Sequence, residues 1–170
     1  MSALVPIELA APEPPYRHWR PAVAMVLIGS LITILPVIAV VPFLPPFGLI
    51  ALLGWRLFRS NALPAWAAAP LGLFDDLVSG QPLGSAMLLW SLCLLALDVL
   101  DTRLVQRDFW QDWLIATGAI ALCLALGRVF AGALSAHVDA PLLVQVAVSG
   151  LAFPAVTRLC AWQYRRSASR

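Results

Sequence analysis

The residues of this chain best placed to do chemistry are Asp75 and Asp76, two adjacent carboxylates inside an apolar segment. A charge at the depth of a lipid bilayer costs roughly 2.5–3.5 kcal/mol per residue, so such residues usually face protein or water and often mark function. The alternative is that both aspartates lie in the headgroup layer and are solvated there. Gly80 and Pro82 then break the helix, and a new apolar run begins at Leu83.

The acidic pair does not have the geometry of a catalytic dyad. Neighbours on a helix of about 3.6 residues per turn point about 100° apart, whereas a dyad needs two carboxyl groups that converge on one point. The set Ser79, His137 and Asp139 is scattered over connecting segments and lacks a nucleophile-elbow or oxyanion-type glycine motif. We therefore predict that the protein is not an enzyme.

The sequence predicts no metal or cofactor site. The cysteines fall singly in separate apolar runs, no C-x-x-C motif occurs, and His18 and His137 are isolated in the sequence. We expect Cys93, Cys123 and Cys160 to be buried as small apolar side chains. The net charge of +2 is too small to indicate binding to nucleic acid.

The composition places these residues in a membrane protein. Hydrophobic residues make up 61% of the 170 residues, charged residues make up 12%, and the mean hydropathy is +0.87. A soluble domain of this size cannot bury so much apolar surface, so we predict an all-α polytopic membrane protein. Six apolar runs are its predicted transmembrane helices: 22–41, 47–58, 62–78, 83–100, 113–134 and 141–162.

The arginines indicate how these helices are oriented. With six helices and a cytoplasmic N-terminus, the arginines that flank the runs all lie on the cytoplasmic side, as the positive-inside rule requires. With four crossings, Arg56 and Arg59 would lie outside. Both termini are therefore predicted to be cytoplasmic, and the connector 103–113 to lie along the interface. The predicted parts are a disordered tail (1–16), a six-helix transmembrane domain (17–164) and a basic tail (165–170).

Arg128 lies within the fifth run and is a candidate partner for the aspartates. Ala121 and Ala125 share its helical face, and small residues line close helix contacts, so we expect Arg128 to point into the bundle. At a rise of about 1.5 Å per residue, Asp76 and Arg128 both reach the outer half of the membrane. We predict an intramembrane charge pair of Arg128 with Asp76, or alternatively with Asp75, because pairing offsets the desolvation of each charge.

The acidic segment also carries a recognisable pattern. It has the form Gly-Leu-x-x-Asp-Leu-x-Ser-Gly-x-Pro-Leu-Gly, with its fixed positions at Gly72, Leu73, Asp76, Leu77, Ser79, Gly80, Pro82, Leu83 and Gly84. This pattern resembles the signature of the bacterial rod shape-determining protein MreD family, small multi-pass proteins of the inner membrane. The resemblance extends over about 17–166, with Phe153 and Pro154 before an arginine-rich end, and Asp75 is an acid additional to the family's single aspartate.

The resemblance implies a non-enzymatic scaffold of the cell-elongation machinery, which sets rod shape and peptidoglycan synthesis. Such a scaffold binds the single-span protein MreC and connects through it to the cytoskeletal MreB, the glycosyltransferase RodA and a class B penicillin-binding transpeptidase. The residues that the resemblance assigns to the shape of the bundle and its partner-binding face are Gly72, Leu73, Asp76, Gly80, Pro82 and Gly84. No cofactor is implied.

The resemblance also implies a helical arrangement similar to that of the substrate-binding subunits of energy-coupling-factor transporters. The alternative function is therefore a small-molecule-binding membrane subunit of such a transporter, which requires a polar, aromatic-lined cavity. The spans offer few side chains for one besides Asp75, Asp76, Arg128, Trp90, Ser91 and Gln145. An ion or proton carrier would need a polar path, and the fourth and sixth runs are almost wholly apolar. We therefore favour the scaffold.

Overall fold

The computed structural model of the chain describes residues 19–32, 45–59, 62–103, 108–130 and 139–168. This described part is helical and contains no strand, which confirms the predicted all-α class. Its elements are α1 (Trp19–Ile32), α2 (Phe47–Phe58), the 3-10 turn η1 (Ala65–Ala67), α3 (Ala68–Ser79), α4 (Ser85–Arg103), α5 (Phe109–Phe130) and α6 (Asp139–Ala168). The tail predicted over 1–16 and parts of the first and fifth runs lie outside the described residues.

The helices follow the predicted runs, with one clear difference in the third. The second run coincides with α2 residue for residue. The third run was expected to form one helix, but η1 precedes α3, and Pro64 before η1 is extended with ψ 151°. A residue that precedes proline is disfavoured in the helical region, so Leu63 cannot continue a helix into Pro64.

The last two helices also extend beyond their predicted limits. The second half of the connector expected along the interface belongs to α5, which begins at Phe109. The sixth helix continues to Ala168, so Arg165 and Arg166 are helical rather than part of a separate tail.

The helices differ in whether they can cross a bilayer. Within the described residues, α4, α5 and the Pro141–Arg166 part of α6 are long and apolar enough to do so, whereas α1 and α2 are shorter. The 12 residues of α2 rise about 18 Å, against roughly 30 Å of hydrocarbon. A helix this short has to be packed among longer ones.

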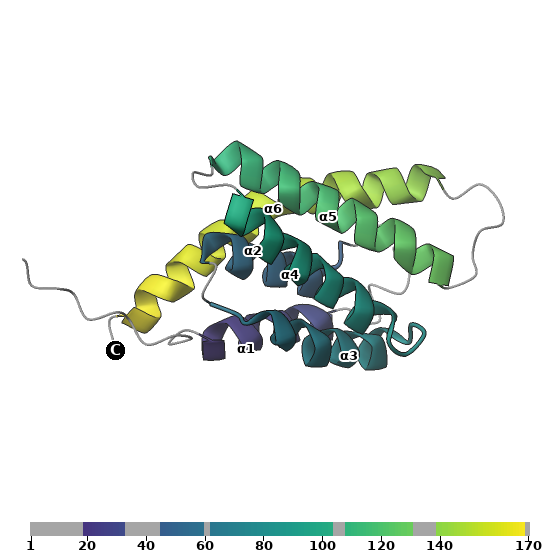
Figure 1. Cartoon of the computed structure of the whole chain (residues 1–170), viewed down its shortest axis with the longest axis horizontal. Coiled ribbons are helices and arrows are strands. Elements are labelled where there is room, and N and C mark those ends of the chain that lie inside the picture. The colour runs from purple at the N-terminus through teal and green to yellow at the C-terminus, as the bar shows by residue number, and fades with distance from the viewer. Residues whose placement is uncertain (1–18, 33–44, 60–61, 104–107, 131–138, 169–170) are drawn as a thin grey trace, which may run out of the picture.

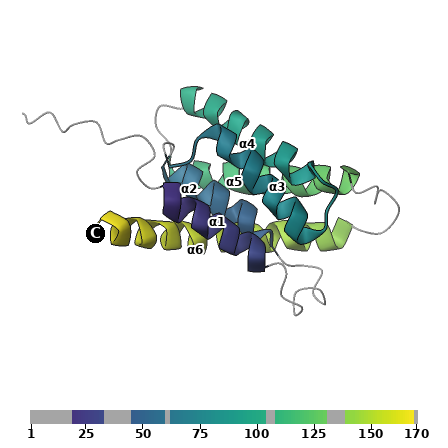
Figure 2. The same ribbon diagram turned by 90° about the horizontal axis from the view of Figure 1, so that it is seen from below.

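The short α2 is the centre of the bundle. Every residue from Gly48 to Arg56 is buried, which is the pattern of a helix that is apolar on all sides. It packs against α1 on one side and against α5 and α6 on the other. Figure 1 shows α1 and α3 along one edge of the molecule and α5 with the first part of α6 along the opposite edge, while the end of α6 crosses towards the start of α1; Figure 2 shows α1 and α2 side by side.

The contact between α5 and α6 compensates for a proline. Pro154 lies inside α6 and has no N–H group, so the carbonyl of Gly150 loses its helical donor. The indole Nε1 of Trp113 donates a hydrogen bond to that oxygen at 2.9 Å. Because lipid offers no water to an unpaired carbonyl, this bond both satisfies α6 and ties it to α5.

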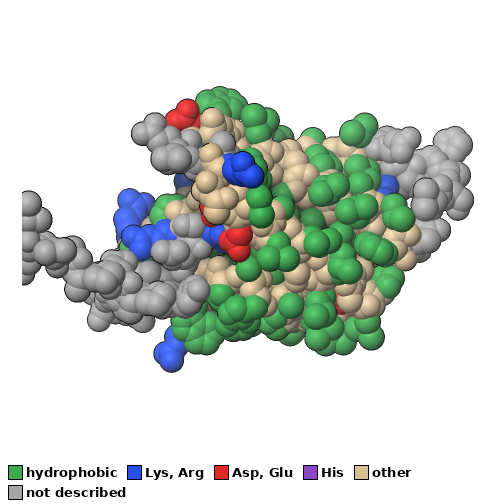
Figure 3. All heavy atoms as spheres, viewed as in Figure 1, with side chains coloured by type: hydrophobic (Ala, Val, Ile, Leu, Met, Phe, Trp, Pro, Cys, Tyr) green, Lys and Arg blue, Asp and Glu red, His purple; other side chains and the backbone are tan. Residues whose placement is uncertain are grey.

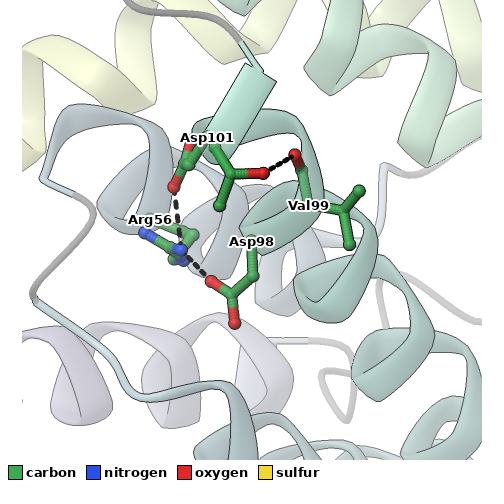
Figure 4. A network of polar contacts seen from close by, with 5 residues as sticks. Arg56, Asp98, Val99 and Asp101 are labelled. Atoms are coloured by element: carbon green, nitrogen blue, oxygen red, sulfur yellow. Dashed lines mark hydrogen bonds and ion pairs between the residues drawn. The ribbon is translucent and has the colours of Figure 1, made fainter.

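A buried arginine joins α2 to α4 (Figure 4). The guanidinium of Arg56 is 5% exposed and forms ion pairs with Asp98 and with Asp101, the latter at 2.9 Å. Asp98 and Asp101 are three residues apart on α4 and therefore share one face. We expected Arg56 at the cytoplasmic interface, and its burial between two carboxylates was not predicted.

The outer surface has the character of a protein in lipid. Apolar side chains cover the face in Figure 3, and arginines gather at the end where α6 finishes. The exposed arginines at the corresponding helix ends are Arg20, Arg59, Arg103, Arg165 and Arg166. Their position at one end agrees with the arginine pattern that the sequence predicts. The side of a membrane that this end occupies stays a prediction.

Replacing Arg56 by leucine should destabilise the bundle by about 2 kcal/mol, because two neighbouring carboxylates would lose their shared cation. The value is below that of a fully buried pair because Asp98 is 43% exposed. Thermal unfolding of the purified protein in mild detergent measures the loss. Arg103→Leu, at an exposed position on α4, is the matched control and should change little. Adding Asp98→Asn and Asp101→Asn should restore part of the stability, and equal losses in Arg56→Leu and Arg103→Leu would contradict the account.

Candidate functional site

The turn between α3 and α4 explains the glycines of the motif. Gly80 ends α3 with φ 69° and ψ 19°, and Gly84 precedes α4 with φ 94°. Both are left-handed conformations that residues with a side chain rarely adopt. Between them Pro82 accepts a hydrogen bond from the N–H of Ser85 at 3.1 Å, which closes the turn. The turn therefore reverses the chain within a few residues.

Gly72 sets how closely α3 approaches α4. A Cβ atom built on Gly72 would lie 2.7 Å from the carbonyl oxygen of Ala86 and 2.7 Å from the backbone N and Cα of Met87. These are backbone atoms and cannot move aside, so a side chain at Gly72 would push the two helices apart. The contact between α3 and α4 is the most extensive one between any two helices of the described part.

This close approach brings the carboxylate of Asp76 to the beginning of α4. Asp76 is 1% exposed. Its Oδ1 accepts hydrogen bonds of 2.9 Å from the hydroxyl of Ser85 and of 2.9 Å from the N–H of Ala86. Its Oδ2 accepts hydrogen bonds of 2.9 Å from the N–H of Gly84 and of 3.3 Å from that of Met87.

These hydrogen bonds satisfy N–H groups that a helix leaves without a partner at its beginning. The first N–H groups of a helix have no partner within it, and together they carry roughly half a positive charge. Ser85 and Ala86 are buried, so their N–H groups cannot turn to water. The carboxylate of Asp76 supplies the acceptors and the negative charge, so the beginning of α4 acts as a built-in anion site for a side chain of α3. Asp76 thus acts as a cap from the preceding helix.

The charge pair of Asp76 with Arg128 stays a prediction. Arg128 is half-buried and lines a hollow of about 250 Å³ that Asp75 also lines, and the alternative pairing with Asp75 is likewise still a prediction. The predicted small-residue face of α5 is wrong in part, because Ala125 is exposed. The helix instead buries a neighbouring stripe, which contains Ala116, Ile120 and Cys123.

The remaining predicted positions have simpler surroundings. Leu73 is 39% exposed and lies on the outer face of α3 with Leu77. Cys93, Cys123 and Cys160 are buried, as expected. In the part of the chain that the structure describes, no group of three or more His, Cys, Asp or Glu side chains is arranged to hold a metal ion.

Sequence reasoning missed Ser85 as a partner of Asp76. Serine is among the preferred residues at a helix N-terminus, and Ser85 stands at the first position of α4, so a signal was present. The hydropathy pattern instead predicts that the fourth run begins at Leu83, two residues earlier, and charge complementarity points to a cation as the partner of the carboxylate.

Changing Asp76 to alanine should lower the stability of the bundle by about 2 kcal/mol, since it removes a helix cap and leaves several buried donors without an acceptor. Asp76→Asn should have a smaller effect in the same direction, because one oxygen remains while the amide N–H₂ faces other donors. Unfolding temperature in detergent is the measurement. Ser79→Ala, at an exposed position near the end of α3, is the control. A variant Asp76→Ala as stable as Ser79→Ala would refute the capping role.

The similarity of this chain to known proteins covers most of the bundle and not the motif alone. Residues 18–161 match the family model of the rod shape-determining protein MreD. No curated protein matches the chain, and no solved structure does. The matched range begins just before α1 and ends in α6, so the likeness is not confined to the turn between α3 and α4. The chain belongs to the rod shape-determining protein MreD family.

Proposed function

We propose that the protein is a non-enzymatic membrane scaffold of the bacterial cell-elongation complex. The observation that carries the proposal is the family match over 18–161, which implies a role in rod shape determination. The location that goes with it is the bacterial inner membrane, with six spans and both termini in the cytoplasm. The gathering of exposed arginines at one end of the bundle supports this orientation.

A scaffold needs a surface whose shape does not change when it binds, and the α3–α4 unit supplies one. Backbone contact at Gly72 fixes the spacing of the two helices, and the four hydrogen bonds of Asp76 fix their register. Preorganisation of this kind lowers the ordering cost of binding. The same unit positions Leu71 and Phe74 of α3, which line the apolar hollow beside α1.

The partner in this proposal is a single-span protein of the MreC type, and through it MreB, RodA and a class B penicillin-binding transpeptidase. We assign its transmembrane helix to the apolar hollow of about 520 Å³ between α1 and the η1–α3 segment. Two exposed tryptophans, Trp19 and Trp66, stand at this hollow, and large aromatic side chains are enriched at protein interfaces. Helix association in lipid depends on packing, which a hollow of this kind offers.

Purification of the tagged protein from its native membrane in mild detergent tests the scaffold. We expect a single-span protein with a periplasmic domain to be retained, and Asp76→Ala to reduce its recovery several-fold relative to Ser79→Ala, because the α3–α4 surface loses its fixed shape. Recovery is measured per amount of membrane-inserted protein, which separates partner loss from poor folding. Retention of a vitamin-sized molecule without a protein partner would support the transporter alternative and refute the scaffold.

Filling the hollow with a bulky side chain tests where the partner binds. Val23→Trp enlarges a half-buried position of α1 that lines the hollow. Ala96→Trp is the matched control and enlarges an exposed position in a second apolar hollow, of about 490 Å³, between α4 and α5. We expect Val23→Trp to reduce partner recovery about tenfold, as the loss of central packing contacts does at other interfaces, and Ala96→Trp to leave it unchanged. The opposite result would move the site to α4 and α5.

A further inference from the structure

The hollow lined by Asp75 and Arg128 differs in character from the rest of the bundle. Side chains from α2, α3, α4, α5 and α6 and from the α3–α4 turn surround a volume of about 250 Å³. Its polar members are Asp75, Gln81, Arg128 and Gln145, and Trp90 supplies an aromatic wall. The two larger hollows described above, beside α1 and between α4 and α5, are lined by apolar side chains and cysteine. Polar groups from separate helices thus converge on one small space.

Placing charged and polar side chains together in this hollow costs free energy, which indicates that they have a function. Charged side chains within a bilayer are expensive and usually mark binding or transport. The hollow lies where α3 ends and α4 begins, near the end of α5 and the beginning of α6, at the end of the bundle opposite the exposed arginines. It shares no lining residue with the hollow that we assign to the partner helix. Its role can therefore be tested apart from the scaffold.

The wall that carries Asp75 is built around a glycine. A Cβ atom at Gly48 would overlap the hydroxyl of Ser30 and would lie 3.0 Å from the ring of Trp90 and 3.2 Å from Oδ1 of Asp75. The absence of a side chain at Gly48 therefore lets the hydroxyl of α1, the carboxylate of α3 and the indole of α4 meet beside α2. The carboxylate and the indole are held in fixed positions by this packing.

We propose that this hollow binds a small zwitterion of the size of an aliphatic amino acid. Its anionic group would lie at the guanidinium of Arg128 and its ammonium group at the carboxylate of Asp75, while the amides of Gln81 and Gln145 donate and accept hydrogen bonds. The indole of Trp90 packs against its aliphatic part. An ion of one sign would gain from one charged wall and be opposed by the other, so a ligand that carries both charges fits best.

The volume sets the size of the ligand. A water molecule occupies roughly 30 Å³ in the liquid, so 250 Å³ corresponds to about eight waters. That is room for an amino acid. The apolar members of the lining, which include Leu89 and Leu124, suit an aliphatic side chain.

Thermal unfolding of the full chain in lipid nanodiscs tests the proposal, because a ligand that binds the folded state raises the unfolding temperature in a saturable way. The probes are alanine and leucine in both enantiomers, each at millimolar concentration. The matched analogues of leucine are isocaproate, which lacks the ammonium group, and isoamylamine, which lacks the carboxylate. We expect at least one amino acid to stabilise the protein and neither analogue to do so. No stabilisation by any of the amino acids, or equal stabilisation by an analogue, would overturn the proposal.

Substitutions of the residues that line the hollow test whether the ligand binds there. Arg128→Gln and Asp75→Asn should each weaken it by about tenfold or more, because each removes a charge-assisted hydrogen bond. Gly127→Val should abolish it while leaving both charges in place, since its Cβ would enter the hollow at an ordinary contact distance, 3.9 Å from Leu89. Ser91→Ala, beside Trp90 on α4, is the control and should respond as the wild type. An undiminished response in Gly127→Val would refute the site, whereas partner recovery should be unaffected by that variant.

Discussion

The carboxylate of Asp76 at the beginning of α4 is the interaction on which the rest of this bundle depends. The first N–H groups of α4 have no partner within their own helix, and the residues Ser85 and Ala86 that carry two of them are buried. Asp76 meets that need from α3, and the helix start in turn stabilises a charge that would otherwise be expensive at this depth. Neither α3 nor α4 would have a satisfactory environment for these groups without the other, so the two helices form one unit.

Several features of the sequence become necessary once this unit exists. The carboxylate reaches α4 only if the helices touch along their backbones, which requires Gly72. It reaches the first turn of α4 only if the chain reverses at once, which requires the left-handed conformations of Gly80 and Gly84. The motif is therefore a set of conditions for one contact. Its residues need not touch a ligand or a partner to be indispensable.

The same helix is held at its other end by a second polar contact. Asp98 and Asp101 near the end of α4 bind Arg56 of the short central α2. Because α2 is shorter than the hydrocarbon layer is thick, its polar end is enclosed by its neighbours, and the ion pairs offset the desolvation that follows. With Asp76 at its start and this cluster near its end, α4 is fixed to α3 and to α2 at opposite ends of the bundle.

Helical class, the limits of α2 and the place of the motif at a turn were accessible from the sequence, because hydropathy and helix-breaking residues are local signals. The partners of buried charges were not. Equal depth in the membrane predicts Arg128 as the partner of Asp76, which stays a prediction, whereas the four hydrogen bonds that this carboxylate accepts come from donors eight to eleven residues along the chain. Backbone donors leave no trace in composition, so only the hairpin geometry reveals them.

Arg56 and Trp113 illustrate the same limit. The positive-inside rule treats an arginine as a reporter of the membrane side and says nothing of its burial, although the spacing of Asp98 and Asp101 on one face of α4 was a usable signal. The indole of Trp113 donates to the carbonyl that Pro154 leaves without a donor, a contact between helices that no local pattern of the sequence indicates. In both cases the decisive fact is a contact between helices.

The two adjacent aspartates have different neighbours because their side chains point in different directions. Successive residues of a helix point about 100° apart, so when Asp76 faces the beginning of α4, Asp75 has to face another neighbour. That neighbour is the polar hollow beside α2, where Gly48 leaves room for its carboxylate. The contact that makes the bundle rigid therefore also determines where the second charge lies. Asp76 thus joins α3 to α4, and the neighbouring Asp75 gives the resulting unit a charged wall facing the hollow.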